Sequence, residues 1–154
     1  MKIPKKIISG GQTGVDRAAL DVSLELGIPC GGWCPKGKKA EDGPIDARYP
    51  LKDTGSAKYQ VRTEKNITES DGTLVLTEGR LTGGTALTIK LAQEFKKPYM
   101  VVDLAQGGNA VSVRAWIEAY KIETLNVAGP RESKVPGIHD KAVDFLWEAF
   151  RIDG

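Results

Sequence analysis

The chain has 154 residues, of which 40% are hydrophobic and 27% charged, and its formal net charge is +2. These values are typical of one globular domain with its own apolar core, which we expect to span residues 1–154. A net charge so close to zero gives no reason to expect nucleic acid or a membrane surface as a partner. Two cysteines make no disulfide framework, and no apolar stretch is long enough to cross a membrane, so we expect a cytoplasmic protein.

The first predicted strand, residues 6–9, leads into a glycine-rich turn and an amphipathic helix over residues 15–26. Glycine tolerates positive φ angles and lets a ligand approach the main chain closely. The helix N-terminus adds unpaired N–H groups and the positive end of its dipole, which together favour an anion such as phosphate. We therefore predict that the turn binds an anion through Gly10, Gly11, Gln12, Thr13 and Gly14.

Two polar side chains of this turn have an alternative role. Thr13 and Asp16 have the spacing of the N-cap and N3 residues of a capping box, in which they would only close the helix end. A carboxylate in the first helical turn would also repel a bound anion, unless the carboxylate serves a hydroxyl group or a metal.

A short strand over residues 28–31 precedes an irregular segment, residues 32–55, that is rich in proline and glycine. Loops longer than about 12–15 residues are uncommon in compact domains and are usually functional or disordered. Trp33 and Tyr49 can anchor this one, so an ordered functional loop is expected.

A helix over residues 56–69 follows. Four side chains that can form hydrogen bonds recur at helical spacing on one face of this helix: Tyr59, Arg62, Thr63 and Asn66. This polar stripe is either a face exposed to solvent or the lining of a polar cavity.

The second half of the chain alternates strands and helices. Strands are predicted over residues 73–77, 98–103 and 124–128. The predicted helices cover residues 86–96, a segment after 107–109, and residues around 142–150, and a glycine-rich loop over 79–85 precedes the first of them. The helix after 107–109 is expected to turn four side chains inward: Val113, Trp116, Ile117 and Tyr120. This alternation predicts an α/β fold: a doubly wound, mostly parallel, five-stranded Rossmann-like sheet with helices on both faces. Each strand is then followed by an irregular or glycine-rich loop, and these special loops are residues 10–14, 32–43, 79–85, 103–109 and 129–137. They all lie at the carboxyl edge of the strands, where such sheets bind ligands. The second glycine loop adds Gly83, Gly84 and Thr85 to the predicted site, although Thr85 could be only a helix cap.

Several charged side chains are candidates for binding or chemistry. Arginine suits phosphate, and of the arginines near the special loops we favour Arg62 and Arg131 over Arg48 and Arg80. Carboxylates could hold Mg²⁺ or act as acid and base, or could simply be exposed loop acids. The candidates for such a catalytic role are Asp16, Glu41 and Asp42.

Other common chemistries are not expected. The first turn lacks the G-x-G-x-x-G pattern and the ribose-binding acid of a dinucleotide site, and no P-loop lysine is present. Cys30 and Cys34 lack companion ligands, so we expect no metal site. His139, the only histidine, is expected to cap the last helix.

The chain resembles a known family along nearly its whole length, the molybdenum carrier (molybdenum cofactor carrier-like) family. The motifs that carry the resemblance are Ser9-Gly10-Gly11-Gln12-Thr13-Gly14-Val15-Asp16-Arg17-Ala18-Ala19-Leu20-Asp21, Gly31-Gly32-Trp33-Cys34-Pro35-Lys36-Gly37, Glu41-Asp42-Gly43-Pro44-Ile45, Arg48-Tyr49-Pro50-Leu51, Ser70-Asp71-Gly72-Thr73, Gly83-Gly84-Thr85 and Leu125-Asn126-Val127-Ala128-Gly129-Pro130-Arg131. The family is similar to a wider Rossmann-like superfamily that includes the lysine decarboxylase-like phosphoribohydrolases. The resemblance implies binding of molybdenum cofactor or a nucleotide-like ligand, and homo-oligomers that are dimers or tetramers.

These observations leave two functions open. The first is a binding or carrier protein for a phosphorylated small molecule, held by the glycine-rich loops at the carboxyl edge of the sheet. The alternative is a phosphoribohydrolase-like hydrolase that acts on a nucleotide-derived substrate, with carboxylate acid–base catalysis and Mg²⁺. The phosphoribohydrolases carry a further glycine and a catalytic glutamate in the second glycine turn, which Leu81-Thr82-Gly83-Gly84-Thr85 lacks. The first function is therefore favoured.

Overall fold

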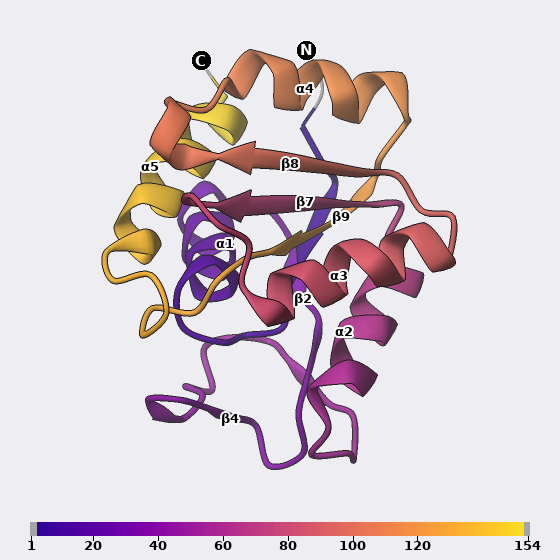
Figure 1. Ribbon diagram of the computed structural model, residues 1–154, viewed down its shortest axis with the longest axis vertical. Helices are drawn as coiled ribbons and strands as arrows, with labels where there is room; N and C mark the ends of the chain where they lie inside the picture. The colour runs from indigo at the N-terminus through magenta and orange to yellow at the C-terminus, as the bar shows by residue number, and fades with distance from the viewer. Residues whose placement is uncertain (1–2, 153–154) are drawn as a thin grey trace.

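The computed structural model describes residues 3–152 and contains a central parallel sheet with helices on both faces (Figure 1). The order of its strands is β2-β1-β9-β7-β8, and every neighbouring pair is parallel. The predicted doubly wound α/β fold is confirmed. The five strands are β1 (Lys6–Ile8), β2 (Cys30–Gly31), β7 (Gly72–Thr77), β8 (Tyr99–Asp103) and β9 (Thr124–Ala128).

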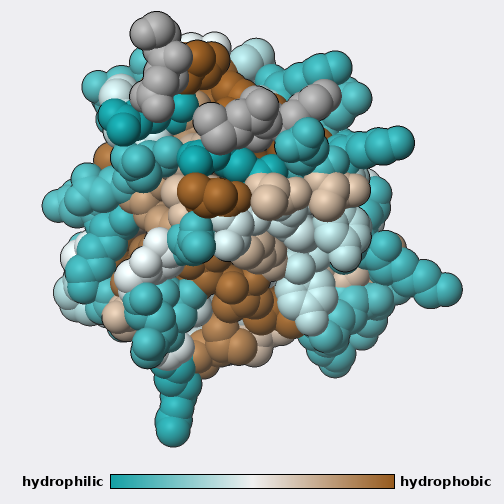
Figure 2. All heavy atoms as spheres, turned by 90° about the horizontal axis from the view of Figure 1, so that it is seen from above, coloured by the Kyte–Doolittle hydropathy of each residue, from teal (hydrophilic) through white to brown (hydrophobic). Residues whose placement is uncertain are grey.

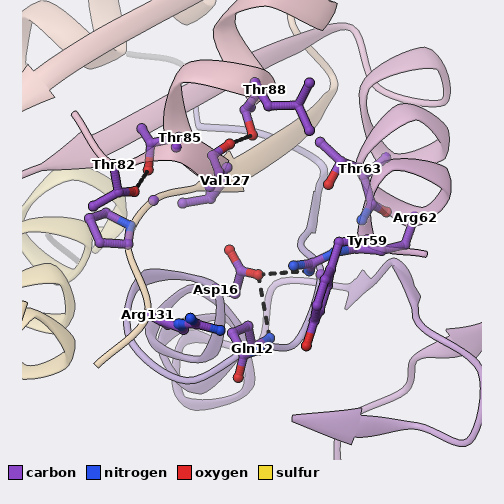
Figure 3. Close-up of a pocket in the computed structure, with 18 of the residues that line it drawn as sticks. Gln12, Asp16, Tyr59, Arg62, Thr63, Thr82, Thr85, Thr88, Val127 and Arg131 are labelled. Atoms are coloured by element: carbon purple, nitrogen blue, oxygen red, sulfur yellow. Dashed lines mark hydrogen bonds and ion pairs between the residues drawn. The ribbon is translucent and has the colours of Figure 1, made fainter. Parts of the chain in front are cut away.

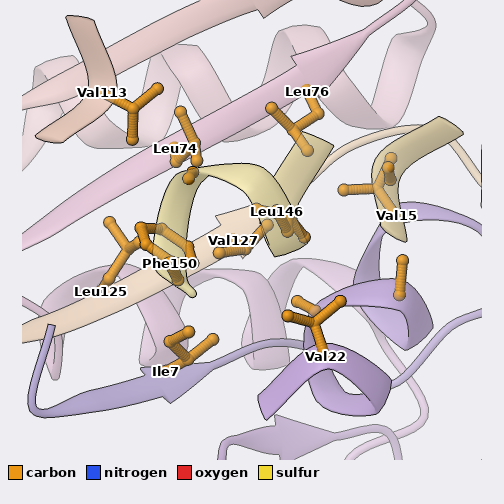
Figure 4. Close-up of a cluster of buried hydrophobic side chains, with 14 of the residues drawn as sticks. Ile7, Val15, Val22, Leu74, Leu76, Val113, Leu125, Val127, Leu146 and Phe150 are labelled. Carbon is orange, nitrogen blue, oxygen red and sulfur yellow. The ribbon is translucent and has the colours of Figure 1, made fainter. Parts of the chain in front are cut away.

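The two faces of the sheet carry different helices. One apolar core joins the sheet to α1, α4 and α5, and contains Ile7, Leu74, Leu76, Leu125 and Val127 from the strands (Figure 4). A smaller core on the other face joins Ile67 of α2 to Leu91 and Ala92 of α3. The helices are α1 (Val15–Leu26), α2 (Tyr59–Thr68), α3 (Gly83–Glu94), α4 (Ala110–Ala119) and α5 (Ile138–Phe150), with a 3₁₀ turn, η1 (Leu104–Gln106), after β8.

The last strand of the chain lies in the middle of the sheet. β9 pairs with β1 on one side and with β7 on the other, so these two strands never touch each other. If the strands were numbered from β9, their order would become 3-2-1-4-5, which is the order of the first five strands of the six-stranded Rossmann fold. The helices that follow β9 and β7, α5 and α3, lie on opposite faces. The loops after β9 and β7 therefore diverge, which makes this the topological switch point.

Residues 32–55 form an ordered lobe at the carboxyl edge. The lobe contains a parallel pair, β3 (Trp33–Cys34) with β6 (Lys52–Asp53), and a hairpin, β4 (Lys39–Ala40) with β5 (Gly43–Pro44). Its own small apolar core packs on α1 and consists of Leu20, Cys34, Ile45, Tyr49 and Leu51.

Several predicted boundaries were wrong. Ile28 is not in a strand, because its N–H bonds to the carbonyl of Ser23 and closes the end of α1. The helix predicted from residue 86 begins at Gly83, since Gly83 and Gly84 continue the helical backbone instead of forming a loop. Tyr120, expected to point inward, lies after the end of α4 and is 59% exposed.

Some large apolar side chains stay at the surface. Val101 of β8 is 41% exposed and Val111 of α4 is 63% exposed. On the face seen from above, Figure 2 shows an uncovered group of apolar residues between hydrophilic ones. Within residues 3–152, no helix is both long and apolar enough to span a lipid bilayer.

Candidate functional site

A cavity of about 350 Å³ lies at the switch point, where the loops after β9 and β7 separate. The first turn of α1, the polar stripe of α2 and the first turn of α3 form its other walls (Figure 3). Of the predicted site residues, this cavity brings together Gly10, Gln12, Asp16, Arg62, Gly83, Gly84, Thr85 and Arg131. Gly11, Thr13, Gly14, Glu41 and Asp42 do not line it.

The N-terminus of α3 opens into the cavity without a cap. The side chain of Thr82, the N-cap residue, makes no hydrogen bond to the helix backbone and instead shares one with Thr85, with 3.0 Å between their hydroxyl oxygens. The first turn carries no acidic residue. Within residues 3–152, no backbone acceptor bonds to the N–H groups of Gly83, Gly84 and Thr85. These donors are therefore available to an anion.

The glycines of this turn are not required by the fold. Neither Gly83 nor Gly84 has a positive φ angle, and a Cβ atom added to either would meet no atom within 4 Å. A glycine without a conformational or packing reason, at the wall of a cavity, leaves room for a close approach by a ligand.

The glycines of the first loop have structural reasons. A Cβ atom at Gly10 would overlap the guanidinium group of Arg62, and one at Gly14 would overlap the carbonyl oxygen of Pro130. That carbonyl also accepts a hydrogen bond from the N–H of Val15, at 3.2 Å, and so closes the N-terminus of α1. The two glycine-rich segments, which the sequence analysis treated alike, differ in this respect.

Asp16 and Arg62 form a buried ion pair in the cavity wall. Arg62 Nη1 lies 3.0 Å from Asp16 Oδ2, and the two side chains are 13% and 9% exposed. Burial raises the pKa of Asp16, although the charge and hydrogen bond of Arg62 act to lower it. The backbone N–H of Gln12 also donates to Oδ2, at 3.4 Å. Oδ1 accepts no hydrogen bond from residues 3–152 and points toward the open space in Figure 3.

Glu41 lies outside the cavity and fastens the lobe to its rim. Its carboxylate accepts hydrogen bonds from Thr13 Oγ1, at 2.7 Å, and from the N–H and hydroxyl of Ser133, at 3.0 and 2.6 Å. It also lies 3.7 Å from Nε of Arg131. Desolvation acts to raise the pKa of Glu41, but the hydrogen bonds from Ser133 and Thr13 outweigh it and lower the pKa. Asp42 pairs with Arg17 at 3.1 Å.

The capping box predicted from Thr13 and Asp16 was wrong. The N-cap residue is Gly14, the hydroxyl of Thr13 is directed to Glu41, and Asp16 is paired with Arg62. The spacing of the two residues was that of a capping box, but partners far away in the sequence take both side chains.

The polar stripe of α2 lines the cavity, which decides between the two interpretations of the stripe. Tyr59, Arg62, Thr63 and Asn66 all border the open space. Asn66 also binds both backbone groups of Trp33, at 2.8 and 3.0 Å, and so fixes the start of the lobe. Several residues that line the cavity were not among the predicted site residues: Thr82, Thr88, Asn126 and Lys134. Lys134 lies in the predicted loop after the last strand, so its position was a usable signal.

The role predicted for His139 was also wrong. His139 does not cap α5, because Glu132 accepts the hydrogen bonds from the N–H groups of Gly137 and His139. The imidazole lies 2.8 Å from Asp21 of α1 and 3.0 Å from Asp140. Burial alone would lower the pKa of His139, but the two carboxylates outweigh it and raise the pKa above 6.5. The residue therefore links two helices through its charge.

Replacing His139 by glutamine should reduce stability at acidic pH only. A histidine whose pKa is raised on folding stabilises the folded state below its unfolded pKa, and this contribution is lost as the pH rises through the folded value. For a partly exposed pair we expect at most about 1 kcal/mol. Urea unfolding of both proteins at about pH 5.5 and 8.5 tests this. An equal difference at both pH values would contradict it.

Residues 7–150 match the model of the circularly permutated YpsA SLOG family. The chain belongs to this family. A solved structure supports the resemblance expected from sequence: the crystal structure of a "putative molybdenum carrier protein" from Syntrophus aciditrophicus is 45% identical, with a TM-score of 0.91 over 96% of this chain and 94% of that chain. No curated protein sequence matches the chain.

A second solved structure, (E)-4-hydroxy-3-methyl-but-2-enyl diphosphate reductase, is 12% identical, with a TM-score of 0.40 over 94% of this chain and 59% of that chain. This likeness is too low to carry an argument. The name of the YpsA SLOG family, by contrast, agrees with the sheet, because placing β9 first restores the 3-2-1-4-5 strand order. The cavity lies beside β9, the strand that this numbering places first.

Proposed function

We propose that the chain is a binding or carrier protein for a phosphorylated small molecule, whose phosphate group is held at the N-terminus of α3. Molybdenum cofactor and nucleotide-like molecules are the candidate ligands. The 45% identical structure named as a molybdenum carrier protein supports the first of them.

The observation that carries this proposal is the uncapped first turn of α3, with two glycines that the fold does not need. Three backbone N–H groups without acceptors and the positive end of the helix dipole point at one place. The hydroxyl groups of Thr82 and Thr85 stand beside them. Arg131 and Lys134 add positive charge to the cavity lining.

The direct test is to identify small molecules that co-purify with the native protein by mass spectrometry. The second arm measures the melting temperature of the protein with phosphorylated pterins, nucleoside monophosphates and inorganic phosphate. A ligand at about 100 times its dissociation constant should stabilise the fold by about 2.7 kcal/mol. No co-purified ligand and no stabilisation by any of these compounds would contradict the proposal.

Replacing Gly84 by alanine should stabilise the fold and weaken binding of the phosphorylated ligand. Alanine fits the helical backbone without a clash, so the free energy of unfolding should rise by a few tenths to about 1 kcal/mol. The added methyl group occupies space next to the free N–H groups, and a misfit of about 1.4 kcal/mol would weaken binding about tenfold. Chemical denaturation and calorimetric titration measure the two effects.

The matched control for this experiment is Gly79→Ala, in the loop before α3. Gly79 also has open space around it but does not line the cavity, and its φ angle is +74°. This variant should lose a little stability and keep its ligand affinity. Unchanged affinity in Gly84→Ala would argue against a phosphate at this turn.

The hydrolase alternative has less support in the geometry. Of its three candidate acids, only Asp16 lines the cavity, while Glu41 and Asp42 are engaged with the lobe and its rim. No cluster of three or more acidic, histidine or cysteine side chains within residues 3–152 is arranged to hold a metal ion. We propose the carrier function on the site's geometry. The cytoplasmic location and the homo-oligomer, a dimer or tetramer, stay predictions.

A further inference from the structure

Among residues 3–152, Asp16 is the only acidic side chain in the lining of this cavity, which is otherwise cationic and neutral. The charged lining residues besides Asp16 are Arg62, Arg131 and Lys134. One oxygen of Asp16, Oδ2, is held by Arg62 and by the N–H of Gln12. The other oxygen, Oδ1, faces the open space without a hydrogen bond from residues 3–152 (Figure 3).

We propose that Oδ1 of Asp16 accepts a hydrogen bond from an O–H or N–H group of the ligand, so that the site selects phosphorylated molecules with such a donor over phosphate alone. This inference rests on the proposed function and names the ligand class more narrowly. The cavity then has two subsites: the first turn of α3 binds the phosphate, and Asp16 binds a neutral donor on the remainder of the molecule.

The chemistry of Asp16 favours a donor over any other group. A charged carboxylate repels the negative charge of a phosphate, so a neutral donor is a better partner for Asp16 than the phosphate is. A charged carboxylate that is 6% exposed has lost most of its hydration, and a hydrogen bond to it from a ligand is charge-assisted and strong. Burial raises the pKa of Asp16, and a hydrogen bond donated to Oδ1 by a ligand would act in the opposite direction, because it favours the charged form.

A metal ion is a poorer occupant. Divalent cations such as Mg²⁺ and Ca²⁺ prefer several oxygen ligands, usually with more than one carboxylate. In the described part of the chain, Asp16 is the only carboxylate in the cavity lining, and Nη1 of Arg62 lies 3.0 Å from it. The positive charge of Arg62 would repel a cation placed at Oδ1.

The neighbouring side chains fit a planar or sugar-like group beside Asp16. The ring of Tyr59 is 49% exposed, borders the cavity, and lies 5.3 Å from the guanidinium carbon of Arg62. An aromatic face next to a hydrogen-bond acceptor can bind a heterocycle by stacking, and it can equally cover a sugar.

The substitution Asp16→Asn turns the acceptor at this position into a donor. Arg62 and the N–H of Gln12 both donate to Oδ2, so the asparagine must place its oxygen there. Its NH₂ group then occupies the position of Oδ1. The variant therefore removes a negative charge and presents a donor to the ligand, with almost no change in shape.

Calorimetric titration of the full chain and of Asp16→Asn should use four probes: inorganic phosphate, ribose 5-phosphate, guanosine 5′-monophosphate and 2′,3′-dideoxyguanosine 5′-monophosphate. We expect the variant to bind inorganic phosphate several-fold more tightly, because the repulsion is gone. It should bind the donor-bearing probe about tenfold or more weakly, because a charge-assisted hydrogen bond is lost. Opposite changes in affinity for the two kinds of probe would indicate that the phosphate and the donor group bind at separate subsites.

The same probes identify which group donates. If a sugar hydroxyl is the donor, the wild-type chain binds ribose 5-phosphate more tightly than inorganic phosphate, and the dideoxy nucleotide loses affinity. If a ring N–H is the donor, both guanosine nucleotides bind equally and more tightly than ribose 5-phosphate. This series needs no variant, so it also tests the proposal if Asp16→Asn folds poorly.

The matched control is Asp42→Asn, which makes the same chemical change outside the cavity. It should shift all four affinities alike. Wild-type affinities that are equal for all four probes, or an Asp16→Asn variant that weakens phosphate and nucleotide alike, would overturn the inference while leaving the phosphate site in place. Failure of every probe, inorganic phosphate included, would overturn the proposed function and this inference with it.

Discussion

Replacing Gly129 by alanine should destabilise the fold by about 3 kcal/mol or more, because the added atom has no room. A Cβ atom at this position would overlap the carbonyl oxygen of Leu76 and would also lie 2.6 Å from Cγ2 of Val15. The carbonyl belongs to β7 and cannot move without disturbing the middle of the sheet. The effect should appear in the midpoint of a chemical denaturation curve.

The substitution Gly129→Ala should also reduce the affinity of the cavity for its ligand. Gly129 follows β9 directly and lines the open space. Pushing β9 away from β7 at this point would change the spacing between the first turn of α3 and the wall formed by Asp16. Ligand affinity should therefore fall even under conditions in which the variant remains folded.

Gly83→Ala is the matched control for this result. It makes the same substitution in the same cavity lining, but its Cβ atom meets nothing within 4 Å. Its free energy of unfolding should stay the same or rise. If both variants lost about the same stability, the close packing of β9 against β7 would not be the cause.

Replacing Arg62 by methionine should destabilise the fold by about 3 kcal/mol at neutral pH, because it leaves the carboxylate of Asp16 buried without its partner. Methionine keeps the apolar stem of the side chain but not the guanidinium group that lies beside Gly10, so the variant removes the charge together with that contact. Protonation of Asp16 removes the unpaired charge. The loss should therefore shrink as the pH falls toward 4, which urea unfolding at several pH values can measure.

A double-mutant cycle separates the pair from the packing of the side chains. Asp16→Asn combined with Arg62→Met removes both charges, so the double variant should be more stable than the sum of the two single losses predicts. A loss in Arg62→Met that does not vary with pH, together with simple additivity, would show that Arg62 contributes through contacts alone.

Local sequence patterns were enough for the fold class and for most element positions. The helix over residues 15–26 and the strand over residues 124–128 have the predicted bounds, because Gly27 ends the first and Gly129 follows the second. The alternation of strands and helices also predicted the edge at which the cavity lies. Strand order could not be predicted in this way, since β9 pairs with strands that are distant in the sequence.

The arrangement of the site depends on contacts that no local pattern contains. Arg62 and Asp16 are 46 positions apart, and Glu41 and Ser133 are 92 apart. Spacing predicted a cap for Asp16 and exposure or catalysis for Glu41, but the distant partners decided both roles. The two glycine-rich segments look alike in sequence, and only the space around each glycine separates structural from ligand-facing positions.

The central place of β9 also affects how the chain can fold during synthesis. β1 and β7 each present an unpaired edge toward the other until residues 124–128 insert between them. The pairings in the middle of the sheet therefore wait until residues 124–128 have left the ribosome. Exposed strand edges of this kind are prone to pair with other chains. The nascent protein is accordingly most exposed to aggregation just before its last strand emerges, and the cavity forms only in the final step.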